Sequence, residues 1–204
     1  MTTEAGPQRL DLRMSPRDLI NIGIFGALYL VTIGVFTLFE FLGPVMTLLT
    51  SAVSIVAAGV PFMLFLTRVR HAGMVTVLAV IVNGFMLLIG SPPIGLVIGV
   101  VAAVIAEALL YAGRYRSRKM SVLAYAVFST WFAGLFMPML YAREEFLSSP
   151  YMESMGEEYT RQLDDLLSPA VLIAFDVSTL VFGVIGGLLG VRLLDKHFRK
   201  AGLV

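Results

Sequence analysis

Cysteine is absent from the sequence, and its absence excludes a whole class of chemistry. None of the 204 residues can form a disulfide bond, a thiolate metal site or a thiol nucleophile. Charged residues are also scarce, at 14% of the chain, and the formal net charge is +1. This is not the composition of a soluble domain, and we expect no nucleic-acid partner.

Motifs for catalysis are missing as well. The chain has no P-loop, so we do not expect it to hydrolyse ATP by itself. No HExxH or nucleophile-elbow pattern indicates a protease or an acyltransferase. The two histidines, His71 and His197, lie in basic stretches, where we expect solvated residues at a membrane interface. We therefore predict a non-catalytic protein with no metal site and no intrinsic cofactor.

Apolar residues, by contrast, make up 58% of the chain, and the mean hydropathy is +0.87. A run of about 20 apolar residues is long enough to cross a bilayer, and such runs recur along the whole sequence. They predict an all-α, polytopic membrane protein with one domain over residues 17–204, preceded by a polar cytoplasmic tail over residues 1–16. The six predicted transmembrane helices cover residues 17–40, 45–67, 72–90, 94–113, 120–141 and 169–193.

Serine and proline mark the beginning of the first predicted helix. Ser15 can cap that helix, and Pro16 suits its first turn because proline lacks the backbone N–H that a first turn leaves unbonded. Gly43 and Pro44 interrupt the apolar pattern at the other end. We therefore expect the first helix to end there, and we expect short hairpins at RVRHAG, between the second and third spans, and at GSPPIG, between the third and fourth.

Basic residues are distributed unevenly over this topology. With six crossings, thirteen of the fifteen lysines and arginines fall on one side of the membrane. The positive-inside rule makes that side cytoplasmic, so both termini are predicted to lie inside. We expect a multi-pass protein of the plasma membrane of a prokaryote. The opposite, extracellular side carries one long acidic connection, residues 142–168.

The outer segment 142–168 is long for a loop without structure of its own, and such loops are usually lids or binding loops. Leu163, Leu166 and Leu167 follow Tyr159 at helical spacing, which is typical of an amphipathic helix lying on the outer surface. A solvated acidic linker is the alternative interpretation, and the sequence leaves both open.

Three strongly polar side chains occur inside the predicted spans, at Asn83, Glu107 and Asp176. Such groups are costly in lipid unless they face a cavity or a partner, so each is a candidate functional residue. Asn83 and Asp176 lie about two turns from the outer surface, at the depth of an externally loaded pocket. For Asp176 a structural bond to a neighbouring helix is the alternative. Glu107 lies towards the cytoplasmic end, and there we prefer a structural role.

The fifth predicted span ends in the stretch WFAGLFMPMLY. Trp131 lies in mid-span, while Met137, Met139 and Tyr141 approach the outer interface around a proline that opens the helix backbone. Together these side chains can line an apolar ligand pocket. An aromatic belt and core packing are the simpler explanations of the same residues.

Small residues form a stripe along the first predicted helix. Gly23, Ala27 and Gly34 lie on it, with Leu30 between them, at steps of four, three and four residues. In lipid the hydrophobic effect does not drive helices together, and small residues allow the close approach that does. The stripe predicts either packing inside the bundle or a docking surface for another membrane subunit. The last predicted helix carries two overlapping GxxxG pairs, for which we prefer packing inside the bundle: Gly183 with Gly187, and Gly186 with Gly190.

Four stretches of the sequence resemble a known family in their order and spacing: RDLINIGIFGALYL, GVPFMLFLTRV, YAVFSTWFAGLFMP and FGVIGGLLGVRLLDKHFRKAGLV. The resemblance is to the Trep_Strep family of integral membrane proteins, and it runs from about Arg17 to the C-terminus. That family is assigned to the S components, or substrate-binding subunits, of energy-coupling factor (ECF) transporters, a type of ABC importer. The resemblance thus implies a six-helix subunit that binds a small-molecule substrate.

The same resemblance implies partners within the lipid bilayer. A small-xxx-small motif on the first helix of an S component docks on a transmembrane coupling subunit, which joins two ATPase subunits that hydrolyse ATP. Gly23 and Ala27 are the matching positions here, and Gly26 with Leu30 marks a neighbouring register. The loaded S component then topples in the membrane and releases its substrate to the cytoplasm.

The resemblance also implies that the outer halves of the helices and the outer loops enclose a vitamin-like micronutrient. Besides the loop after Ala142, the candidate substrate-binding residues are Glu40, Asn83, Trp131, Met137, Tyr141 and Asp176. Haem or another iron compound is a further candidate, and its iron would need Tyr141, Tyr151, Met137 or Met139 as a ligand. Nickel and cobalt are disfavoured because the start MTTEAG has no histidine.

Two functions of other classes stay open. One is a stand-alone membrane enzyme acting on lipid, with Glu107 and Asp176 as an acid and base pair, although their predicted depths differ by most of the bilayer. The other is a self-associating scaffold that uses its glycine-rich helix faces.

Overall fold

The computed structural model describes residues 14–69 and 71–198, and within these ranges every regular element is a helix. The all-α prediction is therefore confirmed for this part of the chain. Most of the predicted tail at residues 1–16 lies outside the described residues, and so does the side chain of His197.

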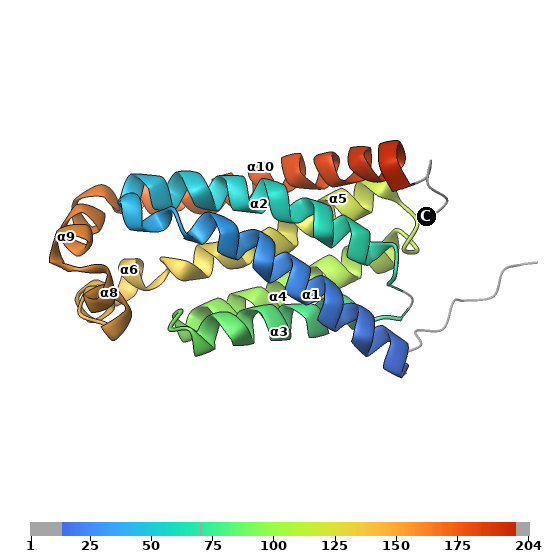
Figure 1. Ribbon diagram of the computed structural model, residues 1–204, viewed down its shortest axis with the longest axis horizontal. Coiled ribbons are helices and arrows are strands. Elements are labelled where there is room, and N and C mark those ends of the chain that lie inside the picture. Colours follow the sequence, from blue (N-terminus) through green and yellow to red (C-terminus); the bar gives the residue numbers. More distant parts are fainter. Residues whose placement is uncertain (1–13, 70, 199–204) are drawn as a thin grey trace, which may run out of the picture.

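Long helices run along one axis of the molecule and form a bundle (Figure 1). They are α1 (Pro16–Thr37), α2 (Pro44–Leu66), α3 (Met74–Leu88), α4 (Pro93–Ala112), α5 (Arg118–Phe128) and α10 (Pro169–Leu193). A 3-10 helix, η2 (Ser129–Leu135), continues α5, and a π-helical turn, η3 (Leu194–Phe198), continues α10. α1 begins and α10 ends at the same end of the bundle, which we call the termini end.

Four segments of the described chain are long and apolar enough to cross a membrane by themselves. They are Pro16–Leu42, Pro44–Leu66, Pro93–Ala112 and Pro169–Lys196. The predicted spans 72–90 and 120–141 fall on shorter helices, because α3 has 15 residues and α5 has 11.

The start of α1 has the cap that its sequence predicts. The backbone N–H of Asp18 donates to Ser15 Oγ over 3.4 Å, and the backbone N–H of Ser15 donates to Asp18 Oδ2 over 2.8 Å. Pro16 occupies the first helical position. His71 Nδ1 lies 2.9 Å from the same Asp18 oxygen, and only 23% of the His71 side chain is exposed. The expectation of a solvated His71 is therefore wrong, since this side chain ties the α2–α3 connection to the start of α1.

The glycines of α10 pack inside the bundle, as preferred from the sequence. Gly183, Gly186 and Gly190 are all buried. A Cβ atom added to Gly186 would lie 2.8 Å from the carbonyl oxygen of Ile55, and one added to Gly190 would lie 2.7 Å from that of Gly59. The backbones of α2 and α10 are therefore in direct contact, which only residues without side chains permit.

Residues 143–168 fold into short helices that cover the end of the bundle opposite to the termini (Figure 1). They form α7 (Arg143–Leu147), α8 (Pro150–Met155) and α9 (Glu157–Leu166), and we call this segment the cap. The preceding short helix, α6 (Pro138–Tyr141), leads into it. Tyr159 and Leu163 of α9 are buried, which confirms the amphipathic helix and excludes a solvated linker.

The cap is held together by an arginine and by apolar packing. Arg143 Nε lies 2.5 Å from Asp164 Oδ1, and its two terminal nitrogens donate to the backbone carbonyls of Asp164 and Leu167. The start of α7 is thereby bound to the end of α9. Buried cap residues join Phe136, which follows η2, and side chains of α6 and α10 in a second hydrophobic cluster beside the main core. Its buried members are Phe136, Met139, Phe146, Met152, Tyr159, Leu163, Leu167, Leu172 and Phe175.

Candidate functional site

A cavity of about 180 Å³ lies between the bundle and the cap, and we call it the cap pocket. Its walls come from the ends of α1, α3 and η2, from the start of α2, and from the cap. Most of the lining is apolar or aromatic, as in small-molecule sites generally. The apolar lining residues are Leu30, Ile33, Gly34, Phe85, Met86, Ile89, Pro92, Trp131, Phe132, Leu135, Phe136, Phe146 and Met152.

The polar lining of the cap pocket consists of one carboxylate and several hydroxyls. These residues are Thr37, Glu40, Thr47, Ser91, Tyr151 and Tyr159. Among the described residues that line it there is no lysine, arginine or histidine. The pocket therefore combines a largely apolar surface with a single site of negative charge.

Glu40 supplies that charge from η1 (Glu40–Leu42), the 3-10 helix between α1 and α2. Its side chain is partly buried, and within the described chain its carboxylate makes no hydrogen bond or ion pair. Burial, together with the charge of Glu40, raises the pKa of Tyr151 to about 12 and raises the pKa of Tyr159 above its ordinary value of 10.0. Both phenols consequently stay protonated and neutral at physiological pH.

A hydrogen bond between the cap and the bundle closes one side of the pocket. Tyr159 of α9 and Thr47 of α2 place their hydroxyl oxygens 2.8 Å apart, and either can donate. Thr47 Oγ1 also lies 3.3 Å from the carbonyl oxygen of Gly43, its partner one turn back. The contact fixes α9 over the start of α2 and places the Tyr159 ring in the pocket wall.

Trp131 forms the deep wall of the pocket and is 2% exposed. Its indole N–H donates to the hydroxyl oxygen of Tyr29 over 3.1 Å, and its ring lies against Phe132 with centroids 4.2 Å apart. A buried tryptophan with a bonded N–H has one defined orientation. Trp131 therefore belongs both to the core and to the pocket, two roles that the sequence left as alternatives.

Asn83 lies beside Trp131 in a small void of about 10 Å³ that adjoins the cap pocket. The void and the pocket share Met86, Ser91 and Pro92 among other residues. Asn83 is 2% exposed, and its Nδ2 donates to the carbonyl oxygen of Ala79 over 3.0 Å. Its Oδ1 atom has no hydrogen-bond partner in the described structure. An unpaired buried acceptor of this kind is costly and calls for a physical explanation.

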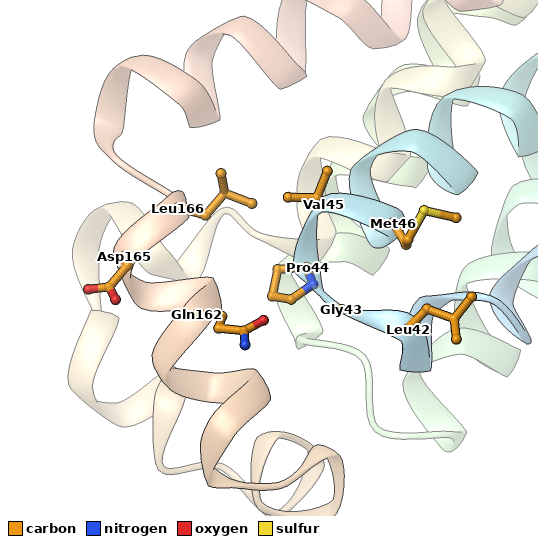
Figure 2. Close-up of a pocket in the computed structure, with 8 residues that line it drawn as sticks. All are labelled: Leu42, Gly43, Pro44, Val45, Met46, Gln162, Asp165 and Leu166. Atoms are coloured by element: carbon orange, nitrogen blue, oxygen red, sulfur yellow. The ribbon is translucent and has the colours of Figure 1, made fainter.

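A separate, more open groove runs between the start of α2 and α9 (Figure 2). The side chain of Gln162 extends towards Gly43 and Pro44 across this groove, and Asp165 lines its rim with the carboxylate turned outward. No aromatic side chain lines the groove among the described residues. The enclosed cap pocket, with its aromatic wall, is the better candidate site.

Residues 16–200 match the model of a family described as hypothetical bacterial integral membrane protein (Trep_Strep). The chain belongs to the Trep_Strep family. No curated protein and no solved structure matches it. The Trep_Strep description and the four long apolar helices together identify a bacterial integral membrane protein. Because that description states no activity, any finer function has to be inferred from the geometry.

The structure brings some of the sequence candidates of this Trep_Strep protein together and leaves others apart. Glu40 and Trp131 line the cap pocket, and Asn83 lines the adjoining void. Tyr141 is 67% exposed and borders a shallow groove outside the pocket, next to Glu145. Met137 and Asp176 do not line the pocket: Met137 precedes α6, and Asp176 is half-buried in α10.

The cap contributes the pocket residues Tyr151, Met152 and Tyr159. The sequence indicated Tyr151 only as a candidate iron ligand, and it indicated Met152 and Tyr159 as binding residues only through the segment 142–168 as a whole. Tyr159 was recognisable as part of an amphipathic pattern with Leu163. That pattern shows that its ring is buried, but it does not show that the ring faces a cavity.

Glu107 has the structural role that we preferred. Its Oε2 atom accepts hydrogen bonds from the backbone N–H groups of Val75 (3.0 Å) and Thr76 (3.3 Å), and its Oε1 atom accepts one from the Tyr115 hydroxyl (2.8 Å). Amides in the first turn of α3 lack partners within the helix. The carboxylate of α4 therefore caps α3, where the helix dipole also favours negative charge.

The small-residue stripe of α1 is not covered by other helices of the described bundle, and its last member, Gly34, borders the cap pocket. Gly23, Ala27 and Gly34 are exposed, and a Cβ atom on either glycine would meet nothing within 4 Å. In the neighbouring register, Gly26 faces inward and a Cβ atom there would lie 3.3 Å from Leu78. Packing within the described bundle thus accounts for Gly26 and leaves Gly23 and Ala27 uncovered.

Proposed function

We propose that the protein is a membrane-embedded, non-catalytic substrate-binding subunit of an ECF-type importer. It captures a vitamin-like small molecule in the cap pocket and delivers it inward by toppling on a coupling subunit. Two separate ATPase subunits provide the energy. The observation that carries this proposal is the enclosed, aromatic-walled cavity beneath a folded cap, at the end of the bundle opposite to the termini.

Helix dimensions support the six-crossing, multi-pass topology that the proposal requires. The 11 residues of α5 and the 7 residues of η2 together rise roughly 30 Å, the thickness of a bilayer core. The 15 residues of α3 rise only about 22 Å, a mismatch that local thinning of the bilayer accommodates. The excess of lysine and arginine on one side then implies that the termini end faces the cytoplasm and the cap faces the outside, with the bundle in the plasma membrane.

The exposed stripe on α1 supports the partnership with a coupling subunit. Gly23 and Ala27 offer a surface on which a second helix can approach to near backbone contact. Gly23 lies in the half of α1 nearer the termini end, which is the cytoplasmic half in this topology, and Ala27 lies at the middle of the helix. Neighbouring exposed side chains of α1, such as Leu19, Ile20 and Ile24, keep that surface apolar.

The other two functions receive less support. The three hydrogen bonds on Glu107 occupy the carboxylate that a lipid-modifying enzyme would need as its acid or base. The buried α10 glycines already pack inside the bundle, so a self-associating scaffold could not use them and would have to rely on other faces.

Co-purification from bacterial membranes tests the proposal. The tagged wild-type chain is expected to carry a coupling subunit and two ATPases with it, and the double variant Gly23→Leu/Ala27→Leu is expected to lose them. Gly84→Leu is the matched control, because a Cβ atom on this α3 glycine also meets nothing within 4 Å. Fluorescence of Trp131 checks that each variant is folded.

Two outcomes would refute the transport role. One is a wild-type chain that brings down no coupling subunit, and the other is a double variant that keeps its partners. Recovery of differently tagged copies of this chain alone would favour the scaffold instead.

A further inference from the structure

We propose that the cap pocket selects an organic cation with a flat aromatic body, and that Glu40 binds its positive group. This inference rests on the proposed function and specifies its substrate class. Three independent features of the described structure carry it: the charge of the pocket, its aromatic walls and an unpaired acceptor in the adjoining void.

Charge is the first feature. Glu40 is the only charged residue among those described as lining the pocket, and no cation of the described chain contacts its carboxylate. Removing a carboxylate from water costs free energy when no protein group pairs with it. A cationic ligand offsets this cost by pairing with the carboxylate. An anionic ligand would meet Glu40 with no lysine, arginine or histidine in the lining to compensate.

The aromatic walls are the second feature. Trp131, Phe132 and Phe136 line one side of the cavity, and Tyr151 of the cap lines it as well. Aromatic faces attract a cation through their quadrupole, most strongly where water is excluded, and they also pack well against a flat ring. The orientation of Trp131 is already set by its bond to Tyr29. This wall is therefore formed before any ligand arrives, which lowers the cost of binding.

The third feature is the unpaired Oδ1 atom of Asn83. Because Nδ2 donates to the carbonyl oxygen of Ala79, the orientation of the amide is fixed, and Oδ1 is left as an acceptor. The adjoining void of about 10 Å³ holds roughly one water-sized group. An N–H group of the ligand, or one water that the ligand contacts, satisfies this atom. Glu40 and Asn83 are both acceptors, so they select a ligand that is rich in donors.

The same features disfavour haem, whose propionates are anionic. Of the four side chains considered as iron ligands, only Tyr151 lines the pocket, and Met137, Met139 and Tyr141 do not. Burial and the charge of Glu40 keep Tyr151 protonated, whereas a ligating phenol has to lose its proton.

A matched series of indoles tests the inference by titration calorimetry on the purified full-length chain in detergent. Tryptamine, 3-propylindole and indole-3-propionate share a ring and a two-carbon arm, and they end in a cation, a neutral methyl group and an anion. Tryptamine is expected to bind the wild type at least about tenfold more tightly than either analogue. In Glu40→Gln the tryptamine affinity is expected to fall by about tenfold or more. In Glu144→Gln, which removes an exposed cap carboxylate outside the pocket, it is expected to stay unchanged.

Any of three results would overturn the inference: indole-3-propionate binding as tightly as tryptamine, tryptamine affinity that survives Glu40→Gln, or no binding by any member at millimolar concentration. Unfolding measured by far-UV circular dichroism shows whether Glu40→Gln is still folded. The titration contains no partner subunit, so its result is independent of coupling. Selective tryptamine binding without co-purifying ATPases would refute transport alone, and co-purification without cation selectivity would refute this inference alone.

Discussion

Substituting Gly59 by alanine should weaken the contact between α2 and α10, the most extensive helix contact in the bundle. A Cβ atom at Gly59 would lie 2.8 Å from Gly186 Cα and closer still to the carbonyl group of that residue. Carbon atoms attract at about 3.5–4.0 Å, so the two helices must separate by roughly 0.7 Å or more. The obstacle is backbone on a long helix, and it cannot rotate away as a side chain would.

The expected cost follows from the contacts that this separation weakens. A gap of about 0.5–1 Å forfeits a quarter to a half of each atom–atom attraction, which is about 0.1–0.2 kcal/mol per pair. A few tens of pairs along the α2–α10 contact then lose roughly 1–3 kcal/mol together, which is the usual range for overpacking. We therefore expect the free energy of unfolding of Gly59→Ala to fall by about 2 kcal/mol.

Titration with sodium dodecyl sulfate in dodecylmaltoside micelles measures this change. Fluorescence of Trp131, the only tryptophan of the chain, and far-UV circular dichroism report the folded fraction. Gly84→Ala is the control: a Cβ atom there meets nothing within 4 Å, and its effect should stay within about 0.5 kcal/mol. The packing account fails if Gly59→Ala is as stable as the wild type, or if Gly84→Ala is destabilised to the same extent.

Two further changes probe the capping carboxylate and the cap. Glu107→Ala should lower the free energy of unfolding by about 2–3 kcal/mol in the same titration, because it removes the acceptor of the Val75 and Thr76 amides. Glu107→Gln keeps one acceptor, so equal losses in both variants would contradict the capping of α3 by Glu107. The pKa of Tyr151 is raised in the folded state, so its contribution to stability is complete below pH 10 and is lost as the pH rises towards about 12. The free energy of unfolding of Tyr151→Phe should therefore fall less steeply than that of the wild type as the pH rises from 10 to about 12. An unchanged dependence of stability on pH would rule out this linkage.

Local sequence signals predicted individual helices well. Ser15 and Pro16 predicted the start of α1, because a cap is made by neighbouring residues and needs no tertiary partner. The spacing of Tyr159 and Leu163 predicted α9 in the same way, because apolar residues that recur every three to four positions lie on one face of a helix. The depth of Glu107 in its span favoured a structural role, but the amides that it caps belong to another helix and could not be named.

The membership of the pocket was harder to predict. Glu40 and Asp176 are both acids in the outer half of the predicted topology, yet Glu40 lines the cavity and Asp176 does not. Hydropathy measures how deep a residue lies, whereas the rotation of the helix decides which neighbour it faces. Tyr151 is a further case, because its position depends on how the cap folds back over the bundle.

By itself, the sequence determined that this chain is a membrane protein made of helices, roughly where those helices begin, and that residues 142–168 contain an amphipathic helix. Only the tertiary structure decided that Gly26 faces α3 while Gly23 faces outward, and that Glu40, Trp131 and the cap tyrosines enclose one cavity. The physical reason is that lipid and protein interior are both apolar. Composition therefore cannot distinguish the face of a membrane helix that meets a neighbour from the face that meets lipid, and close packing alone makes that choice.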